Sequence, residues 1–165
     1  KAMKKEELIA FLLEANKAGY ADANAKVTDQ PDGAHEIIIK KDGWLFTDHW
    51  FGGDPFSGQE SITKDGKAIW AMQYRGRVCK GFEDRADEVF GFLKQALGRC
   101  TPEEPLRGPN EYEDGGWRYE NTWSHNLSEF EGVENIYYQG TLAHVCKYMG
   151  GVVDGFMFNA ENEAS

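Results

Sequence analysis

The chain has little positive charge for its size. Its 165 residues include 18 lysines and arginines against 28 aspartates and glutamates, so the formal net charge is −10 at pH 7. Nucleic-acid-binding proteins present clustered basic residues, and the longest basic runs here are the pairs Lys4-Lys5 and Lys40-Lys41. The sequence therefore predicts no direct nucleic-acid binding. The acidity is compatible with a cationic ligand or with solubility alone.

Cysteine is also scarce. Cys79, Cys100 and Cys146 are scattered along the chain with no CxxC pair, which argues against a disulfide framework or a zinc site. No run approaches eighteen apolar residues, and the charged residues 1–7 do not resemble a signal peptide. We expect a cytoplasmic, bacterial protein without a membrane segment.

The common catalytic and nucleotide-binding motifs are missing. The chain contains no GxxxxGK(S/T), no GxGxxG that opens a helix, no GxSxG and no HExxH. The four histidines lie on different predicted elements without the spacing of metal ligands. We therefore expect no metal, no other cofactor and no identifiable catalytic residue, and the pattern favours a binding module over an enzyme. One enzymatic alternative stays open, a hydrolase that uses a carboxylate pair chosen from Asp48, Glu60 and Glu134.

The sequence does contain an ordinary apolar fraction of 41% and many aromatic residues, 13%, with five tryptophans. Such a chain can build one α+β domain, which we place at residues 1–158, followed by a frayed tail at 159–165. Apolar spacing predicts amphipathic helices over 4–18, with Gly19 as the C-cap, and over 84–97. Asp65-Gly66 predicts a type I′ hairpin. β-Branched and aromatic runs predict strands over 35–40, 44–50, 60–64, 67–74, 117–124, 134–138 and 142–148.

The clearest pattern is an internal repeat. Residues 56–76 align with residues 130–150 without a gap, and seven of the twenty-one positions are identical. The repeat predicts two pseudo-symmetric units, each a helix followed by a three-stranded meander, at about 4–76 and about 84–150. The two units would form one curved antiparallel sheet with both helices packed on one face. Positive φ is expected at the hairpin glycines, Gly66 and Gly140.

Matching residues of two such units meet near the axis between them, where ligands are often held. Upstream extension of the alignment pairs Trp44 with Trp117 and Trp50 with Trp123. The predicted ligand-binding residues, which would line an aromatic and acidic cleft, are Trp44, Asp48, Trp50, Glu60, Trp70, Arg107, Trp117, Trp123 and Glu134. In the alternative interpretation the tryptophans belong to the core, Arg107 pairs with a glutamate, and the two glutamates accept backbone N–H groups of the preceding loops.

Four motifs carry a resemblance to a known family: Phe51-Gly52-Gly53, Phe56-Ser57-Gly58-Gln59-Glu60, Trp70-Ala71-Met72-Gln73-Tyr74-Arg75-Gly76 and Arg107-Gly108-Pro109. Together they resemble the bacterial domain of unknown function 5680 family, over nearly the whole chain from the first helix to Gly150-Gly151. Members of that family stand alone or follow Xre-type helix-turn-helix domains, and the resemblance brings no established activity and no catalytic residues. This chain shows no helix-turn-helix, so any regulation of DNA would need a separate protein partner.

A looser, fold-level analogy is with GyrI-like effector-binding domains, which are also duplicated α+β units and accept organic cations in an aromatic and acidic cleft. The order of elements here would require a circular shift. We therefore predict a small-molecule-binding or sensor domain for a cationic or polar ligand. The second prediction is a protein-interaction module that uses sheet edges or the loop 51–56, and the third is the hydrolase. The sequence specifies no oligomeric state.

Overall fold

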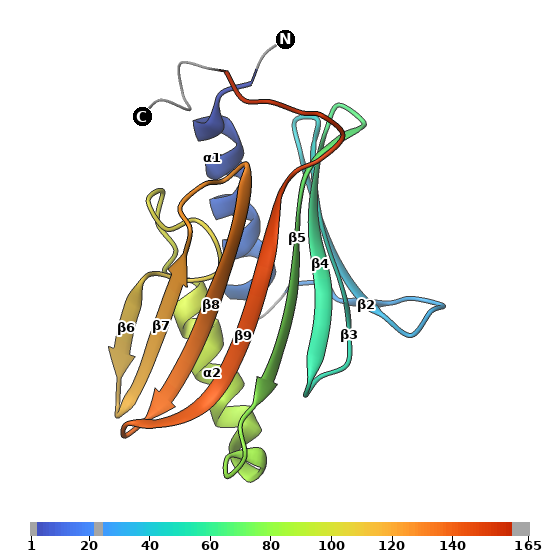
Figure 1. Cartoon of the computed structure of the whole chain (residues 1–165). Helices are drawn as coiled ribbons and strands as arrows, with labels where there is room; N and C mark the ends of the chain where they lie inside the picture. The colour runs from blue at the N-terminus through green and yellow to red at the C-terminus, as the bar shows by residue number, and fades with distance from the viewer. Residues whose placement is uncertain (1–2, 22–24, 160–165) are drawn as a thin grey trace.

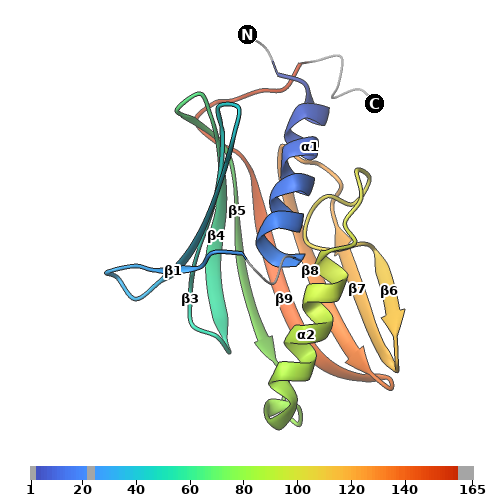
Figure 2. The same ribbon diagram turned by 180° about the vertical axis from the view of Figure 1, so that it is seen from behind.

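The computed structural model describes residues 3–21 and 25–159. Within these residues nine strands form one curved sheet in the order β1-β2-β3-β4-β5-β9-β8-β7-β6, and neighbouring strands are antiparallel. Figure 1 shows the sheet in front of the helices, and Figure 2 shows from behind that both helices lie on the same face. The predicted α+β class and the curved antiparallel sheet are confirmed. Of the predicted tail, only Asn159 lies within the described residues.

Two stretches of the chain, each a helix followed by strands, supply the elements. The strands are β1 (Thr28–Asp29), β2 (His35–Lys41), β3 (Trp44–Phe51), β4 (Phe56–Lys64), β5 (Lys67–Val78), β6 (Glu111–Asp114), β7 (Trp117–Trp123), β8 (Glu129–Tyr138) and β9 (Thr141–Val152). Helix α1 (Lys5–Asn16) continues as a π-helical turn, η1 (Lys17–Ala21). Helix α2 (Ala86–Leu97) follows a 3-10 turn, η2 (Glu83–Arg85), so the predicted helix over 84–97 begins in a tighter form.

Tight turns set the register of the hairpins. Asp65-Gly66, between β4 and β5, has φ angles of 49° and 82°, and Gln139-Gly140, between β8 and β9, has φ angles of 46° and 82°. Two consecutive positive φ values are what a two-residue type I′ hairpin requires, and glycine supplies the second without steric strain. The predicted hairpin at Asp65-Gly66 and the positive φ of both glycines are therefore confirmed.

The strands before α2 form one meander, β1 to β5, and those after it form a second, β6 to β9, so the prediction of three strands in each meander is wrong. The two meanders meet along one pair of strands, β5 and β9. Tyr74 lies opposite Tyr148 in this pair, and a flanking pair joins Arg75 with Lys147. We call this line of contact the β5–β9 seam. It joins residues that are far apart in the sequence, so it depends on long-range pairing and not on a turn.

The core lies between the sheet and the two helices. Helix α1 packs Leu8 and Phe11 into one apolar cluster with the fully buried Trp70, and α2 packs Val89 and Leu93 into a second cluster. Buried and exposed residues alternate along the second half of β5, because successive side chains of a strand point to opposite faces. One face of the sheet is therefore covered by helices and the other is free of them. No helix in the described part of the chain is long and apolar enough to cross a membrane.

Candidate functional site

Several polar and charged side chains are buried in places where the helix-covered face would ordinarily be apolar. Each is at most 6% exposed, and in the described part of the chain they are Asn16, Asp48, Glu60, Arg107, Asn121, Glu134 and His144. Burying a charge is costly unless hydrogen bonds or an opposite charge compensate it, so such groups indicate a built polar site. Apart from Asn16 and His144, these side chains form two networks, one on each side of the β5–β9 seam.

The first network joins two carboxyl groups through a phenol. The Tyr20 hydroxyl lies 2.5 Å from Asp48 Oδ2 and 2.5 Å from Glu60 Oε1, and the Tyr74 hydroxyl donates to Asp48 Oδ1 at 2.5 Å. Asp48 on β3 and Glu60 on β4 are register partners, so they lie side by side. Tyr20 comes from the π-helical turn after α1. The predicted C-cap at Gly19 is therefore wrong, because the helix widens there and brings the phenol to the carboxyl groups.

A glycine makes room for each central tyrosine. Tyr74 on β5 lies opposite Gly58 on β4, and its ring crosses β4 to reach Asp48 on β3. A Cβ at Gly58 would stand only 2.4 Å from the Tyr74 hydroxyl oxygen. Tyr148 on β9 crosses Gly132 on β8 in the same way, and a Cβ there would stand 2.2 Å from the ring. The close approach of the ring, and not a turn, requires glycine at both positions.

The second network neutralises its carboxylate with an arginine. Glu134 accepts hydrogen bonds from Arg107 Nε at 3.1 Å and from Nη2 at 2.8 Å, and the Tyr119 hydroxyl donates to Glu134 at 2.6 Å. Asn121 donates to two backbone carbonyls of the loop that carries Arg107, and it accepts from the Tyr148 hydroxyl at 2.6 Å. Arg107 has a φ of 65°, a conformation that costs a non-glycine residue about 1–3 kcal/mol. The network therefore holds a strained loop, and the pairing of Arg107 with a glutamate is present.

The two networks affect their carboxyl groups differently. Burial, followed by the negative charge of Asp48, raises the pKa of Glu60 to about 7. Burial also raises the pKa of Asp48, although hydrogen bonds from the two tyrosines oppose the shift. Burial acts in the same direction on Glu134, but the Arg107 guanidinium outweighs it and holds the pKa of Glu134 below its usual value. Carboxyl groups with a raised pKa therefore belong to the first network.

A cavity of about 340 Å³ opens beside the first network, between α2 and the sheet. Its polar end is formed by Tyr20, Asp48, Tyr74 and Arg107. Its apolar walls are formed by Ile37, Trp50, Phe56, Phe90, Leu93 and Leu97. Apolar walls that lead to a few converging polar groups are typical of a small-molecule site.

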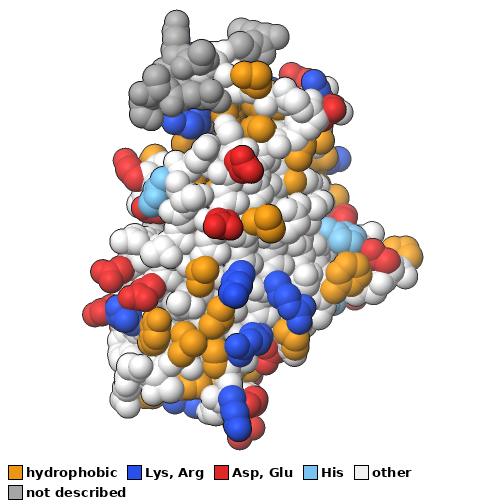
Figure 3. All heavy atoms as spheres, in the orientation of Figure 1, with side chains coloured by type: hydrophobic (Ala, Val, Ile, Leu, Met, Phe, Trp, Pro, Cys, Tyr) orange, Lys and Arg blue, Asp and Glu red, His pale blue; other side chains and the backbone are white. Residues whose placement is uncertain are grey.

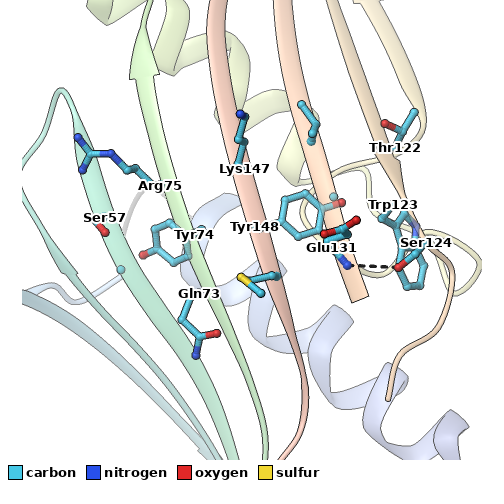
Figure 4. A pocket seen from close by; sticks show the side chains of 14 residues that line it. Ser57, Gln73, Tyr74, Arg75, Thr122, Trp123, Ser124, Glu131, Lys147 and Tyr148 are labelled. Atoms are coloured by element: carbon cyan, nitrogen blue, oxygen red, sulfur yellow. Dashed lines mark hydrogen bonds between the residues drawn. The ribbon is translucent and has the colours of Figure 1, made fainter. Parts of the chain in front are cut away.

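Three larger hollows lie elsewhere. One, of about 820 Å³, lies over the β5–β9 seam on the helix-free face, where Figure 4 shows side chains such as Arg75, Lys147 and Glu131. The second, of about 700 Å³, lies beside Trp123 and His125, and the third, of about 430 Å³, lies beside the turn between β6 and β7. None of the three is lined by a buried carboxyl or guanidinium group. Figure 3, which views the helix-free face, likewise shows charged side chains spread over an open surface. The smaller cavity is therefore the candidate site.

The structure brings together part of the predicted ligand-binding set. Asp48, Trp50 and Arg107 line the cavity, Glu60 adjoins it through Tyr20, and Glu134 holds Arg107. The alternative in which the two glutamates accept backbone N–H groups is wrong for the described residues. Their partners are phenol hydroxyls and a guanidinium, because only these longer donors reach carboxyl groups buried at the centre of the sheet.

The remaining tryptophans lie outside the cavity. Trp44 stacks on a ring of α1 with centroids 5.0 Å apart, and Trp117 stacks on a ring of α2 at 5.8 Å. Trp70 is fully buried and donates to a backbone carbonyl at 3.1 Å, and Trp123 donates to Glu104 at 2.7 Å. Trp44 and Trp117 belong to different apolar clusters, so the predicted meeting of this pair is wrong. Their strands, β3 and β7, lie two strands from the seam on opposite sides, and only residues near the seam can meet across it.

Sequence reasoning missed the tyrosines of both networks. Tyr74 and Tyr148, like Gly58 and Gly132, are identical positions of the repeat alignment, and this was the signal that could have found them. Tyr20 lies outside the alignment. Its role depends on a contact between η1 and the sheet, which no local pattern indicates.

A comparison with models of protein families gives a match. A family model described as Domain of unknown function (DUF5680) matches residues 48–153, well over half of the chain. The matched span begins at Asp48 and contains Glu60, Arg107 and Glu134, but it leaves out α1 and η1, to which the resemblance was expected to extend. No curated protein and no solved structure matches the chain. In the part of the chain that the structure describes, no three His, Cys, Asp or Glu side chains gather in a way that could hold a metal ion.

Proposed function

The chain belongs to the domain of unknown function (DUF5680) family, and we propose that it is a small-molecule-binding or sensor domain. The cavity between α2 and the sheet would hold the ligand. The apolar body of the ligand would pack against the aromatic walls, and its cationic or polar head group would meet Asp48. A sensor of this kind would act through a separate protein partner.

One observation carries the proposal: a cavity of small-molecule size ends on a buried carboxyl group that has no ion-pair partner among the described residues. Each oxygen of Asp48 accepts one tyrosine hydroxyl, so each can accept a further hydrogen bond from a ligand. Aromatic walls such as Trp50, Phe56 and Phe90 favour ligands with apolar or cationic groups, since aromatic faces attract both.

We further propose that the two meanders are copies of one ancestral unit. The β5–β9 register supports this, because Tyr74 faces its own equivalent, Tyr148. The crossing of a glycine by a tyrosine, at Gly58 in the first meander and at Gly132 in the second, supports it as well. Such a duplication would place the two polar networks in equivalent positions.

The difference between the two networks then supports a single binding site. Asn121 takes the place in the second unit that Asp48 takes in the first, and each accepts a tyrosine hydroxyl. Arg107 donates to Glu134 and forms no ion pair with Glu60 in the described structure. The second network is thus electrically balanced and serves the scaffold, whereas the first keeps two acidic groups beside a cavity.

A thermal-shift screen of metabolites and organic cations tests the proposed function. A ligand should raise the melting temperature of the wild type and lose its effect on Asp48→Asn, which copies the residue that the second network carries. Asp42→Asn, in the exposed turn between β2 and β3, is the matched control and should keep the effect, because asparagine also tolerates the positive φ of 49° at that position. Ligands that stabilise both variants equally would contradict the proposal.

The two alternatives have less support. The large apolar side chains exposed in the described residues are Val27, Ile38, Phe51, Met149 and Met157, which are spread over β2, β3, β9 and two loops instead of forming one docking patch. A hydrolase would need its two carboxyl groups on either side of a substrate. Tyr20 contacts both Asp48 and Glu60, so it occupies the space between them.

A further inference from the structure

Three buried carboxyl groups and one buried guanidinium lie in the two networks. Arg107 donates to both oxygens of Glu134, and its charge also opposes the rise in the pKa of Asp48 and of Glu60 without forming an ion pair with either. Asp48 and Glu60 form no ion pair with any described residue, and they are register partners on neighbouring strands. Two adjacent negative charges that are both removed from water repel each other strongly, so the pair of carboxyl groups favours a state in which one of them holds a proton.

The hydrogen bonds indicate where that proton lies. The Tyr20 hydroxyl has one proton, yet its oxygen lies 2.5 Å from a carboxyl oxygen of each residue. Asp48 also accepts from Tyr74, which favours its ionised form, so the Tyr20 proton points to Asp48. Glu60 is then the protonated partner and donates to the Tyr20 oxygen. Its pKa of about 7, raised chiefly by burial, agrees with this assignment.

We infer that the cavity takes a singly charged organic cation in exchange for the proton of Glu60. The inference rests on the proposed function, because it concerns the same cavity. When the cation binds, one of its N–H groups donates to Asp48 Oδ2, the Tyr20 hydroxyl turns from Asp48 to Glu60, and the Glu60 proton leaves to solvent. Three hydrogen bonds exist before and after the exchange. One positive charge enters as one leaves, so the net charge of the cluster does not change.

This charge balance selects among ligands. A neutral molecule leaves Glu60 protonated and gains only neutral hydrogen bonds. An anion would meet the carboxylate of Asp48 at the polar end of the cavity, where repulsion is weakly screened. The guanidinium at that end, Arg107, is already paired with Glu134. A monocation both replaces the lost proton and packs against the aromatic walls, which attract cations. Lys94 lines the cavity, but it is exposed to solvent, so water screens its charge.

Most other groups around Glu60 do not titrate near neutral pH. The titratable and charged groups that influence it or are influenced by it are Tyr20, Asp48, Tyr74, Cys100, Arg107, Glu134 and Cys146. Burial raises the pKa values of the two phenols and the two thiols, to about 12 for Cys146, so all four remain neutral. His49, beside Asp48 on β3, is an exception, because a hydrogen bond to Glu36 raises its pKa above the ordinary histidine value. The titration of His49 therefore has to be distinguished from that of Glu60.

Isothermal titration calorimetry with three probes that share a phenyl ring tests the charge requirement. The probes are phenethylammonium, 2-phenylethanol and phenylacetate. Phenethylammonium should bind on the order of tenfold more tightly than the other two, because its hydrogen bond to Asp48 is charge-assisted. Its binding heat should differ between phosphate and Tris buffers by the heat of about half a proton at pH 7, since a group with a pKa of about 7 is half protonated there. Its affinity should tighten about tenfold from pH 6 to pH 8.

Two variants separate the exchange from binding itself. In Glu60→Gln the amide donates to the Tyr20 oxygen as the protonated glutamate does, but it has no proton to release. This variant should bind phenethylammonium without proton release and with an affinity that does not change with pH, although His49 still titrates. Glu131→Gln, exposed on the helix-free face of β8 and outside the cavity, is the control and should keep both the proton release and the pH dependence.

Several results would overturn the inference. They are equal affinity for phenethylammonium and 2-phenylethanol, a binding heat that does not depend on the buffer, an unchanged pH dependence in Glu60→Gln, and no binding of any of the three probes. A neutral or anionic compound that stabilises the protein through Asp48 in the thermal-shift screen would also overturn it, but the proposed function would stand. If no compound depends on Asp48, both fail.

Discussion

Glu60→Gln should make the folded protein more stable at alkaline pH and leave its stability almost unchanged at acidic pH. The Glu60 side chain is 3% exposed and accepts or donates one hydrogen bond, with Tyr20. When ionised it stands beside Asp48 without a cation, which is unfavourable in a buried site. Glutamine is neutral at every pH and keeps an N–H donor for the Tyr20 oxygen. The substitution therefore removes a titration and conserves the shape.

The size of the effect follows from the raised pKa of Glu60. The carboxyl group titrates near its ordinary value of 4.5 in the unfolded chain and at about 7 in the folded protein. Between these values the folded protein holds a proton that the unfolded chain has lost, so the free energy of unfolding falls by about 1.4 kcal/mol for each pH unit as the pH rises. Over the whole interval the loss amounts to about 3 kcal/mol, complete above a pH of about 7 and absent below about 4.5.

Urea denaturation of the variant and the wild type at several pH values measures this loss. The difference in free energy of unfolding should rise from near zero at about pH 4.5 to about 3 kcal/mol in favour of the variant at about pH 8. Glu131→Gln, exposed on the helix-free face of β8, is the matched control and should follow the wild type within about 0.5 kcal/mol. A variant that is less stable than the wild type at pH 8, or a difference that does not change with pH, would refute the reasoning.

Three further predictions test the scaffold around the site. Arg107→Met should lower the free energy of unfolding by about 3–5 kcal/mol, because it leaves the Glu134 carboxylate buried without its cation. In a double-mutant cycle, the addition of Glu134→Gln should recover part of this loss. Strictly additive losses would contradict the coupling. Gly58→Ala should lower the free energy of unfolding by about 1–3 kcal/mol in urea denaturation, because the new methyl group would stand 2.4 Å from the Tyr74 hydroxyl oxygen. Gly91→Ala, exposed on α2 with no atom within 4 Å, should raise it by about 0.5–1 kcal/mol. Similar effects of the two substitutions would show that the close contact is unimportant. His144→Leu should raise the free energy of unfolding by about 1 kcal/mol in calorimetric melting, because both ring nitrogens are buried without a hydrogen-bond partner among the described residues. A loss of stability with an unchanged circular dichroism spectrum would indicate that the imidazole has a polar partner.

Local physics made parts of the fold predictable. The turn at Asp65-Gly66 needs residues that tolerate positive φ, and the apolar spacing of α2 marks the face that it buries. The widening of the first helix at η1 was not predictable in this way. It places Tyr20 against Asp48 and Glu60, and these contacts span 28 and 40 residues of sequence, so no local window contains the cause.

By itself, the sequence determined the turns, the helix faces and the strand alternation that puts Asp48, Glu60 and Glu134 on the covered face of the sheet. Only the tertiary structure decided which of these acids meets a cation. Arg107 arrives on a loop and reaches Glu134, and the other two carboxyl groups share a single phenol beside the cavity. Strand alternation depends on neighbours along the chain, whereas the compensation of a buried charge depends on a few ångströms between residues that only the complete fold brings together.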